Sequence, residues 1–245
     1  MTFSTRRRFL RVSLLPGLLF LPLAACMTRR KPDGREERDF DPKYLAKTDM
    51  DRVSDASRSQ VMDSLFLLAE KLYRRNPREW KKAGFGRQEE AVEALRGYRE
   101  TAPEGLAGEQ EGKAVLRAFA PDYPGDRVAA LIYGLLTMVD AAYEHKDEFF
   151  ILDSLNAQKL YNSARNVEIA AWKLASTHDE SGKPLLLSNE MEDGSRNLSF
   201  EREFGRIIGQ LDFIALVTSD RSGRAVTGVS QSLATAVFLP VGMLK

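Results

Sequence analysis

The sequence predicts an all-α fold, a helical bundle of about six to eight helices formed by residues 52–245. Large apolar residues recur every three or four positions over most of this region, which is the period of one face of an α-helix. Proline, glycine and asparagine interrupt the pattern where helices are expected to end. No segment shows the apolar and polar alternation, followed by a tight turn, that predicts a β-hairpin. We therefore expect helices packed on helices, without a sheet.

The first half of this region is predicted to hold one long helix and three short ones. The long helix begins at Ser54 or Ser57 and ends at Arg74, because Asn76-Pro77 stops it. Its apolar stripe consists of Val61, Leu65, Leu68 and Leu72. The short helices are expected at 78–83, 88–99 and 108–119.

The most apolar helix is predicted between Asp126 and Tyr143. Asp126 is a favourable first residue, because an aspartate side chain can accept a hydrogen bond from a backbone N–H that the first turn leaves unpaired. Apolar side chains follow around most of the helix circumference, which is typical of a helix that other helices surround. We expect this helix to form the centre of the core.

Three more helices are predicted in the second half of the region. Their ranges are 153–176, 200–217 and 223–239, and Pro240 stops the last one. That last helix is predicted from Val226, Val229, Leu233 and Val237, which stand at helical spacing.

A tetratricopeptide-like array is a minority alternative for the fold. Asn76-Pro77 and the run Ala120-Pro121-Asp122-Tyr123-Pro124 resemble the ends of tetratricopeptide helices. The prolines at 77 and 124 are 47 residues apart, however, whereas that repeat has a period of about 34 residues.

The first 25 residues have the organisation of a cleaved signal peptide. Arg6, Arg7, Arg8 and Arg11 precede an apolar stretch from Val12 to Leu23. This stretch is shorter than the roughly 20 apolar residues that a spanning helix needs, and two prolines interrupt it.

Leu23-Ala24-Ala25-Cys26 follows directly and resembles the lipobox of bacterial lipoproteins. The resemblance implies that Cys26 is acylated with fatty acids such as palmitate, that the chain is cleaved before it, and that lipid holds the mature protein to a membrane. Met27 follows the cysteine, in place of the aspartate that retains enteric lipoproteins in the inner membrane. We therefore expect the periplasmic face of the outer membrane, with the inner membrane as the alternative.

The arginines also resemble a second export signal. Arg6, Arg7, Phe9 and Leu10 match the twin-arginine motif, which exports proteins already folded in the cytoplasm. An ordinary secretory signal explains the same residues equally well, so the export route stays open.

Cleavage leaves a chain of 220 residues and removes four arginines, which changes the formal net charge from +1 to −3. A slightly acidic chain is a poor ligand for nucleic acid. Cys26 is the only cysteine, so its acylation leaves no thiol for a disulfide, a nucleophile or a metal site in the monomer. Residues 26–51 are charged and poor in large apolar groups, and this composition predicts a flexible tether between the lipid and residues 52–245.

The sequence predicts no catalytic residue, no metal site and no cofactor. Gly228-Val229-Ser230-Gln231-Ser232 lacks the second glycine of a nucleophile elbow. His145 lies among carboxylates, but helical spacing brings only Glu148 to its side, so a solvated helix end is the favoured interpretation.

Two surfaces are candidates for binding. A basic segment that surrounds an aromatic residue fits anionic headgroups or an acidic partner; it consists of Arg74, Arg75, Arg78, Trp80, Lys81 and Lys82. Its alternative is a basic helix end beside a core tryptophan. A polar stripe on the 153–176 helix consists of Gln158, Asn162, Arg165 and Asn166, and either fixes neighbouring elements or lines a groove. Fixing neighbouring elements is the favoured role.

These observations predict a membrane-anchored periplasmic lipoprotein that acts as a binding or scaffold module in the cell envelope, with an envelope protein as partner. The alternative is a periplasmic enzyme or small-ligand binder that uses the polar groove of the 153–176 helix.

Overall fold

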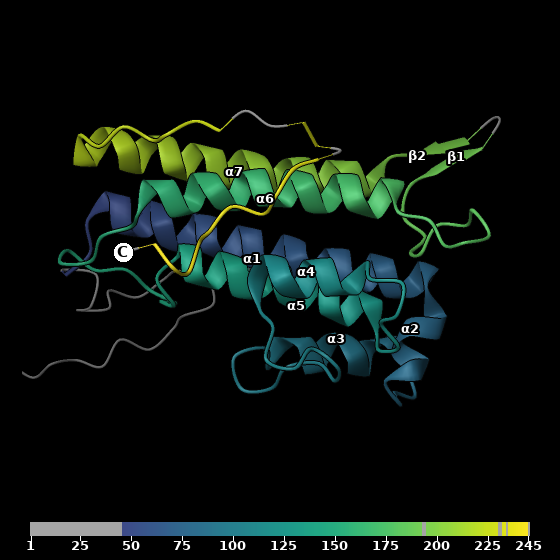
Figure 1. The fold of residues 1–245 in the computed structure, drawn as a ribbon. Coiled ribbons are helices and arrows are strands. Elements are labelled where there is room, and N and C mark those ends of the chain that lie inside the picture. Colours follow the sequence, from purple (N-terminus) through teal and green to yellow (C-terminus); the bar gives the residue numbers. More distant parts are fainter. Residues whose placement is uncertain (1–45, 193–194, 230–231, 234, 245) are drawn as a thin grey trace, which may run out of the picture. The chain divides into compact units, whose positions relative to one another are not determined.

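A computed structural model describes residues 46–192, 195–229, 232–233 and 235–244 of the protein. The predicted signal residues, Cys26 and most of the predicted tether lie outside these ranges. The described residues form seven α-helices and one short two-stranded hairpin, as Figure 1 shows. The prediction of an all-helical bundle of six to eight helices is confirmed.

The helices alternate between long and short along the chain. Their bounds are α1 Asp49–Arg75, α2 Pro77–Lys82, α3 Gln88–Arg96, α4 Glu111–Ala118, α5 Arg127–Ala142, α6 Ala157–Ser176 and α7 Ser199–Ser222. The hairpin strands are β1 Glu190–Glu192 and β2 Ser195–Asn197.

Four long helices form a closed ring, in which α1 contacts α5, α5 contacts α6, α6 contacts α7, and α7 returns to α1. Neighbours α1 and α5 run antiparallel. The Tyr73 hydroxyl donates to Asp126 at one end of the pair, and the hydroxyls of Ser57 and Tyr143 share a hydrogen bond at the other. Helices α2, α3 and α4 pack outside the ring against α5. This closure distinguishes the fold from an open array of helical repeats.

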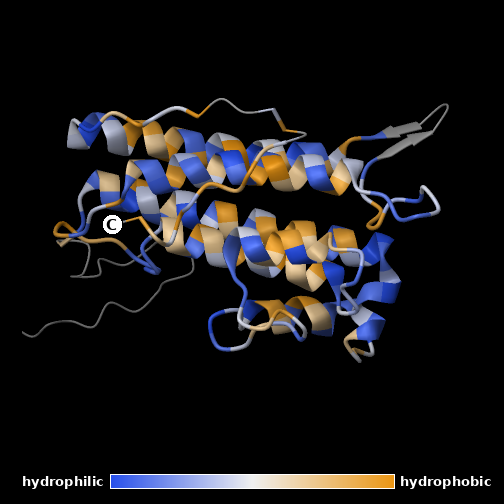
Figure 2. Cartoon of the chain, in the orientation of Figure 1, coloured by the Kyte–Doolittle hydropathy of each residue, from blue (hydrophilic) through white to orange (hydrophobic). Residues whose placement is uncertain are grey.

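Helix α5 is the centre of the core, as its composition predicted. Every residue from Arg127 to Ala142 is buried, and hydrophobic residues dominate this helix (Figure 2). The Asp126 side chain accepts a hydrogen bond from the Ala129 N–H, so the predicted N-cap is confirmed.

Helix α1 begins earlier than its apolar stripe predicted, because a capping box precedes the stripe. The Thr48 hydroxyl accepts a hydrogen bond from the Asp51 N–H at 3.2 Å, and the Asp51 carboxylate accepts one from the Thr48 N–H at 2.7 Å. The described residues from Ala46 onward form one compact helical unit. Residues 46–51, predicted as the end of the tether, belong to this unit.

The predicted helix at 223–239 is wrong. Gly223 adopts a left-handed conformation with φ 64° and ends α7, and the described residues after it are not helical. The helical spacing of apolar residues was misleading, because Val229, Leu233 and Val237 are exposed and form no buried stripe. Extended backbone is instead stabilised by hydrogen bonds to side chains of α6, described below.

The expectation that strands are absent is also wrong, although only over six residues. Strands β1 and β2 pair antiparallel, with Glu190 opposite Asn197. Strands of three residues are too short to show an alternating pattern in sequence.

The contact between α4 and α5 depends on Gly134. A Cβ at this position would lie 2.6 Å from the Glu111 carbonyl oxygen and 2.8 Å from the Val115 backbone nitrogen. Both are backbone atoms that cannot move aside without shifting α4.

Gly134→Ala is therefore expected to lower the free energy of unfolding by about 1–3 kcal/mol, despite the better helix propensity of alanine. Urea unfolding measures this. The matched control is Gly209→Ala in α7, where a Cβ meets no atom within 4 Å, and we expect it to stabilise the protein by up to about 1 kcal/mol. Equal stabilisation by both substitutions would contradict the close approach.

Candidate functional site

The polar stripe predicted on α6 is covered by the described residues after α7 (223–229, 232–233 and 235–244), which are called the C-terminal segment below. The Asn166 side chain donates to the Leu239 carbonyl at 2.8 Å and accepts from the Leu239 N–H at 2.7 Å. Asn162 donates to the Pro240 carbonyl at 2.8 Å. Both asparagines are buried. These amides satisfy an extended backbone, as an adjacent β-strand would.

Gln158 repeats this arrangement one turn nearer the start of α6. Its side chain donates to the Thr227 carbonyl at 3.2 Å and accepts from the Thr227 N–H at 2.8 Å. The Tyr161 hydroxyl accepts from the Val229 N–H at 3.2 Å. Arg165 is directed instead to α7, where it pairs with Asp212 at 2.7 Å. The stripe therefore fixes neighbouring segments and leaves no open polar groove at these amides.

The same C-terminal segment is anchored by apolar contacts. Val241 is fully buried, and Phe238 packs against the core. Gly112 permits this, because a Cβ there would lie 2.6 Å from the Phe238 Cβ. Beyond the anchor, the Gly242 N–H donates to Glu111 at 3.3 Å.

The predicted basic segment lies at the C-terminal end of α1 and along α2. Its exposed cations are Arg74, Arg78, Lys81 and Lys82. Arg75 is half-buried, and Trp80 is half-buried against the core, as the core interpretation expected. Lys82 pairs with Glu79 at 2.8 Å, and the Lys81 ammonium lies 5.2 Å from the Trp80 ring centre. Of the exposed cations, Lys81 is therefore the one that lies over the Trp80 ring.

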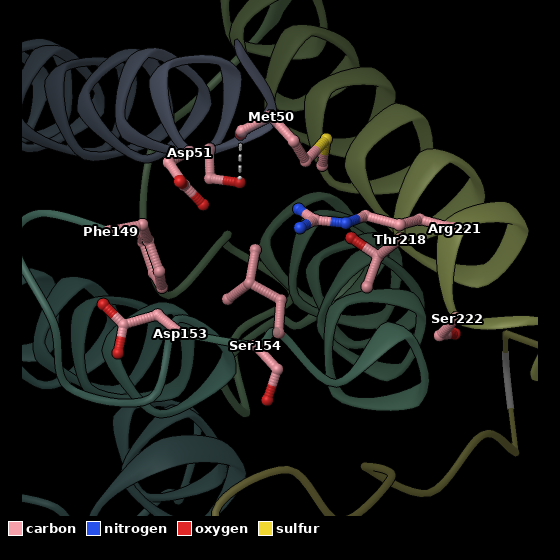
Figure 3. A pocket seen from close by; sticks show the side chains of 10 residues that line it. Met50, Asp51, Phe149, Asp153, Ser154, Thr218, Arg221 and Ser222 are labelled. Carbon is pink, nitrogen blue, oxygen red and sulfur yellow. Dashed lines mark hydrogen bonds between the residues drawn. The ribbon is translucent and has the colours of Figure 1, made fainter. Parts of the chain in front are cut away.

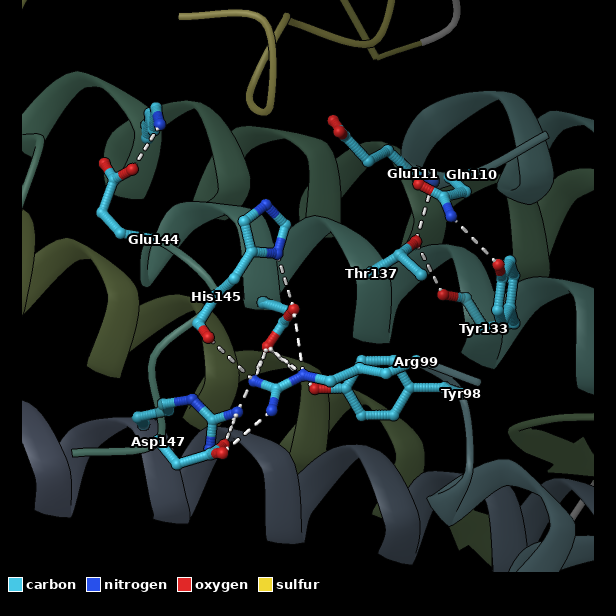
Figure 4. A network of polar contacts seen from close by, with 12 residues as sticks. Tyr98, Arg99, Gln110, Glu111, Tyr133, Thr137, Glu144, His145 and Asp147 are labelled. Atoms are coloured by element: carbon cyan, nitrogen blue, oxygen red, sulfur yellow. Dashed lines mark hydrogen bonds and ion pairs between the residues drawn. The ribbon is translucent and has the colours of Figure 1, made fainter. Parts of the chain in front are cut away.

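A polar cluster surrounds Asp140 on α5 and was not predicted; Figure 4 shows its members Tyr98, Arg99, His145 and Asp147. Tyr98 donates to the buried Asp140 carboxylate at 2.9 Å, and Arg58 at 3.2 Å. Arg99 donates to the same carboxylate and to Asp147 at 2.9 Å. The sequence signal for this cluster was Asp140, an acidic residue inside an otherwise apolar helix. Its partners lie in three other segments of the chain, so the signal alone could not identify them.

His145 completes this cluster. Its Nδ1 atom lies 2.7 Å from the Asp140 carboxylate, while 68% of its side chain is exposed. Glu144 and His145 both adopt positive φ angles, 55° and 57°, which non-glycine residues rarely do. Helix α5 ends at Ala142, and the chain turns sharply at Glu144 and His145. His145 and Glu148 therefore do not lie on one helix, as the sequence spacing had suggested.

Hydrogen bonds decide the charge of Asp140. Burial by itself would raise the pKa of this carboxyl, but hydrogen bonds from Arg99, His145 and Tyr98 outweigh it and hold the pKa at about 2. The carboxylate is therefore ionised near neutral pH, where it orients the imidazole and, together with Asp147, balances the charges of Arg58 and Arg99. An oriented imidazole can transfer protons, but the partner of His145 here is the Asp140 carboxylate, which Arg99 and Tyr98 also hold.

An apolar cavity of about 230 Å³ lies between α1, α3 and the start of α5. Tyr73, Phe85 and Leu95 line it, together with the carboxyl of Asp126. Burial raises the pKa of Asp126 to about 6. Both carboxyl oxygens already accept hydrogen bonds, from Ala129 and Tyr73, so the cavity offers mainly apolar contacts.

A second cavity, of about 180 Å³, lies where α1 begins and α7 ends (Figure 3). Met50, Phe149 and Leu155 form its apolar side, and Thr218 and Arg221 its polar side. The buried Thr218 hydroxyl has no hydrogen-bond partner among the described residues.

An exposed apolar turn lies at this same end of the bundle, and the sequence analysis did not predict it. Ile151 is 59% exposed and Leu152 is 95% exposed. In the sequence, Phe149-Phe150-Ile151-Leu152 looks like a core segment, and only Phe149 is buried as such a segment would be.

No protein-family model matches the chain, and no curated protein or solved structure matches it either. In the part of the chain that the structure describes, no helix is both long and apolar enough to cross a membrane. Within the same ranges, no three His, Cys, Asp or Glu side chains are grouped to hold a metal ion.

Asn166→Ala is expected to lower the free energy of unfolding by about 2 kcal/mol, because it leaves the backbone of Leu239 without its partner. Backbone hydrogen exchange should become faster around residues 238–242. The control is Gln158→Ala, which removes the same kind of pair at an exposed position and should cost less than about 1 kcal/mol. If Asn166→Ala costs nothing, the amide is not structural and a ligand groove becomes the better explanation.

Asp140→Asn is expected to cost about 3 kcal/mol at pH 7, because the buried arginine contacts lose their counter-charge. Since the folded-state pKa of Asp140 is lowered, its contribution is present above about pH 4 and is lost as the pH falls toward 2. Urea unfolding measures the difference in unfolding free energy between wild type and variant, and this difference should therefore become smaller between pH 4 and pH 2.

Asp147→Asn serves as the control, because this exposed carboxylate pairs with the same arginines and should cost less than about 1 kcal/mol. If the loss of unfolding free energy caused by Asp140→Asn does not change with pH, the Asp140 carboxyl is not the ionised group described here.

Proposed function

We propose that the protein is a lipoprotein held by lipid on Cys26 to the periplasmic face of the outer membrane, where its helical domain acts as a binding or scaffold module. The observation that carries this proposal is the sequence Leu23-Ala24-Ala25-Cys26 after an arginine-rich start and a short apolar stretch. Several acyl chains are needed for firm anchoring, because one chain alone binds a bilayer only marginally.

The length of chain between Cys26 and the helical domain supports this proposal. About 20 residues separate Cys26 from Ala46, and their composition predicts a flexible tether. A flexible chain of this length has an average end-to-end distance of about 25 Å. The domain is then held close to the membrane surface while it remains free to turn toward a partner.

The position of the basic segment favours a protein partner over lipid headgroups. Helix α1 has 27 residues, so its two ends are about 40 Å apart. The tether joins at the first end, and Arg74, Arg78 and Lys81 lie at the second. These cations fit an acidic protein surface in the periplasm, and the half-buried Trp80 ring, 5.2 Å from the Lys81 ammonium, adds an apolar contact.

The contacts of the polar stripe on α6 support the scaffold over the alternative, an enzyme or small-ligand binder that uses that stripe. Gln158, Asn162 and Asn166 are already paired with the C-terminal segment, and Arg165 with Asp212. A scaffold with a packed interior and separate exposed surfaces agrees better with these contacts.

Intact mass and membrane fractionation of wild type beside Cys26→Ser test the proposal. We expect acyl mass on the wild-type chain, recovery of that chain in the outer-membrane fraction, and loss of both in the variant. The matched control is Met27→Asp, expressed in an enteric host, which should keep the acyl mass and move to the inner membrane. Unmodified, soluble wild-type protein would overturn the proposal.

A further inference from the structure

The turn at residues 150–153 presents two aliphatic side chains to solvent. Ile151 and Leu152 occupy its two central positions, and they are 59% and 95% exposed. Single exposed aliphatic residues are common on protein surfaces. Two adjacent ones at the tip of a turn are a more specific feature, because the tip projects from the surface around it.

The turn has a defined structure. The Asp153 N–H donates to the Phe150 carbonyl at 2.7 Å, and the Asp153 carboxylate accepts from the Phe150 N–H at 2.9 Å. Lys146 pairs with the same carboxylate. These contacts hold the turn closed, so the aliphatic side chains cannot fold back into the core without breaking them.

The turn is fastened to the first residues of the helical domain. The Ile151 N–H donates to the Ala46 carbonyl at 3.0 Å. The Lys47 ammonium lies 4.8 Å from the Phe150 ring centre, and the Phe149 N–H donates to Asp55 at 2.7 Å. The exposed tip therefore lies beside the residue at which the predicted tether joins the domain.

We propose that Ile151 and Leu152 insert into the membrane to which Cys26 is anchored and form a second, apolar contact with it. This inference rests on the proposed lipid anchor and adds to it a defined end of the domain that touches the bilayer. The tether keeps the tip within a few tens of ångströms of the membrane, so even a weak contact is favoured by a high effective concentration.

The charges around the tip favour apolar insertion over attraction to anionic lipid. Lys146 pairs with Asp153, and Lys47 pairs with Asp55 and Glu148. Because these cations already have carboxylate partners, the contact is expected to depend little on salt and on the fraction of anionic lipid.

A fluorescent label at position 152 tests the inference. In the acylated chain Cys26 carries lipid, so Leu152→Cys provides the only free thiol for an environment-sensitive fluorophore. The labelled full-length protein is placed in vesicles of phosphatidylethanolamine and phosphatidylglycerol, with and without a lipid that carries a quencher. We expect a blue-shifted emission that the lipid quencher reduces at least twofold and that persists in 1 M salt, a condition that screens exposed charges beyond about 3 Å.

The matched control is Leu198→Cys, just before α7, where the native side chain is 46% exposed and lies at the end of α7 opposite the one beside Phe149 and Asp153. Its label should remain in water, with no quenching by lipid. Equal quenching at both positions would overturn the inference, since the whole domain would then lie on the bilayer.

The other outcomes separate this inference from the proposed anchor. A water-exposed label at 152 in a chain with confirmed acyl mass overturns the insertion and leaves the anchor intact. A label that is shielded in cells but not in pure vesicles also overturns it, because a protein then covers the turn. A native chain without acyl mass contradicts the anchor, and the label is then placed in Leu152→Cys combined with Cys26→Ser, which again leaves a single thiol at position 152. Shielding of that label on added vesicles supports the insertion, and a water-exposed label overturns it.

Discussion

The complete burial of α5 is the constraint on which the rest of the structure depends. Every polar group on a buried helix needs a partner inside the protein, and each such partner fixes another segment. Asp126 at its start binds Tyr73 of α1. The Arg127 guanidinium donates to the carbonyl of Ala118, the last residue of α4, at 2.6 Å, and to that of Ala120 just after it at 2.7 Å. Thr137 accepts from the Glu111 N–H at 2.9 Å, which positions the first turn of α4 against the glycine that lets the two backbones approach.

The two ends of the bundle carry different surfaces, one with an exposed apolar turn and the other with exposed cations. At one end, the buried Asp140 carboxylate gathers Arg99 and His145 and shapes the sharp turn after α5, from which the chain leads to Ile151 and Leu152. At the other end, α1 finishes with Arg74 and Arg75, and α2 follows with Lys81 and Lys82 in its last turn. An apolar turn beside the start of the domain and a basic surface about 40 Å away suit a module that contacts a membrane at one end and a partner at the other.

Sequence reasoning predicted what local patterns determine. The wholly apolar helix and its Asp126 cap depend on neighbouring residues, so both were predicted correctly. The C-terminal segment was predicted wrongly, because its extended backbone is stabilised by Asn166, 73 residues away along the chain, and spacing alone cannot show such a partner. The exposure of Leu152 was missed for a similar reason. A run of apolar residues usually indicates a core, and the spacing does not show the hydrogen bonds that hold the turn, from Ile151 to Ala46 and between Phe150 and Asp153.

Hydrogen–deuterium exchange of the acylated chain, in vesicles and in detergent, measures most directly which end of the domain meets the membrane. We predict slower exchange in vesicles for residues 146–153 and for the first turn of α1, with unchanged rates for residues 74–82. Protection of residues 74–82 without protection of the turn would contradict the account, because the basic segment would then be the membrane surface.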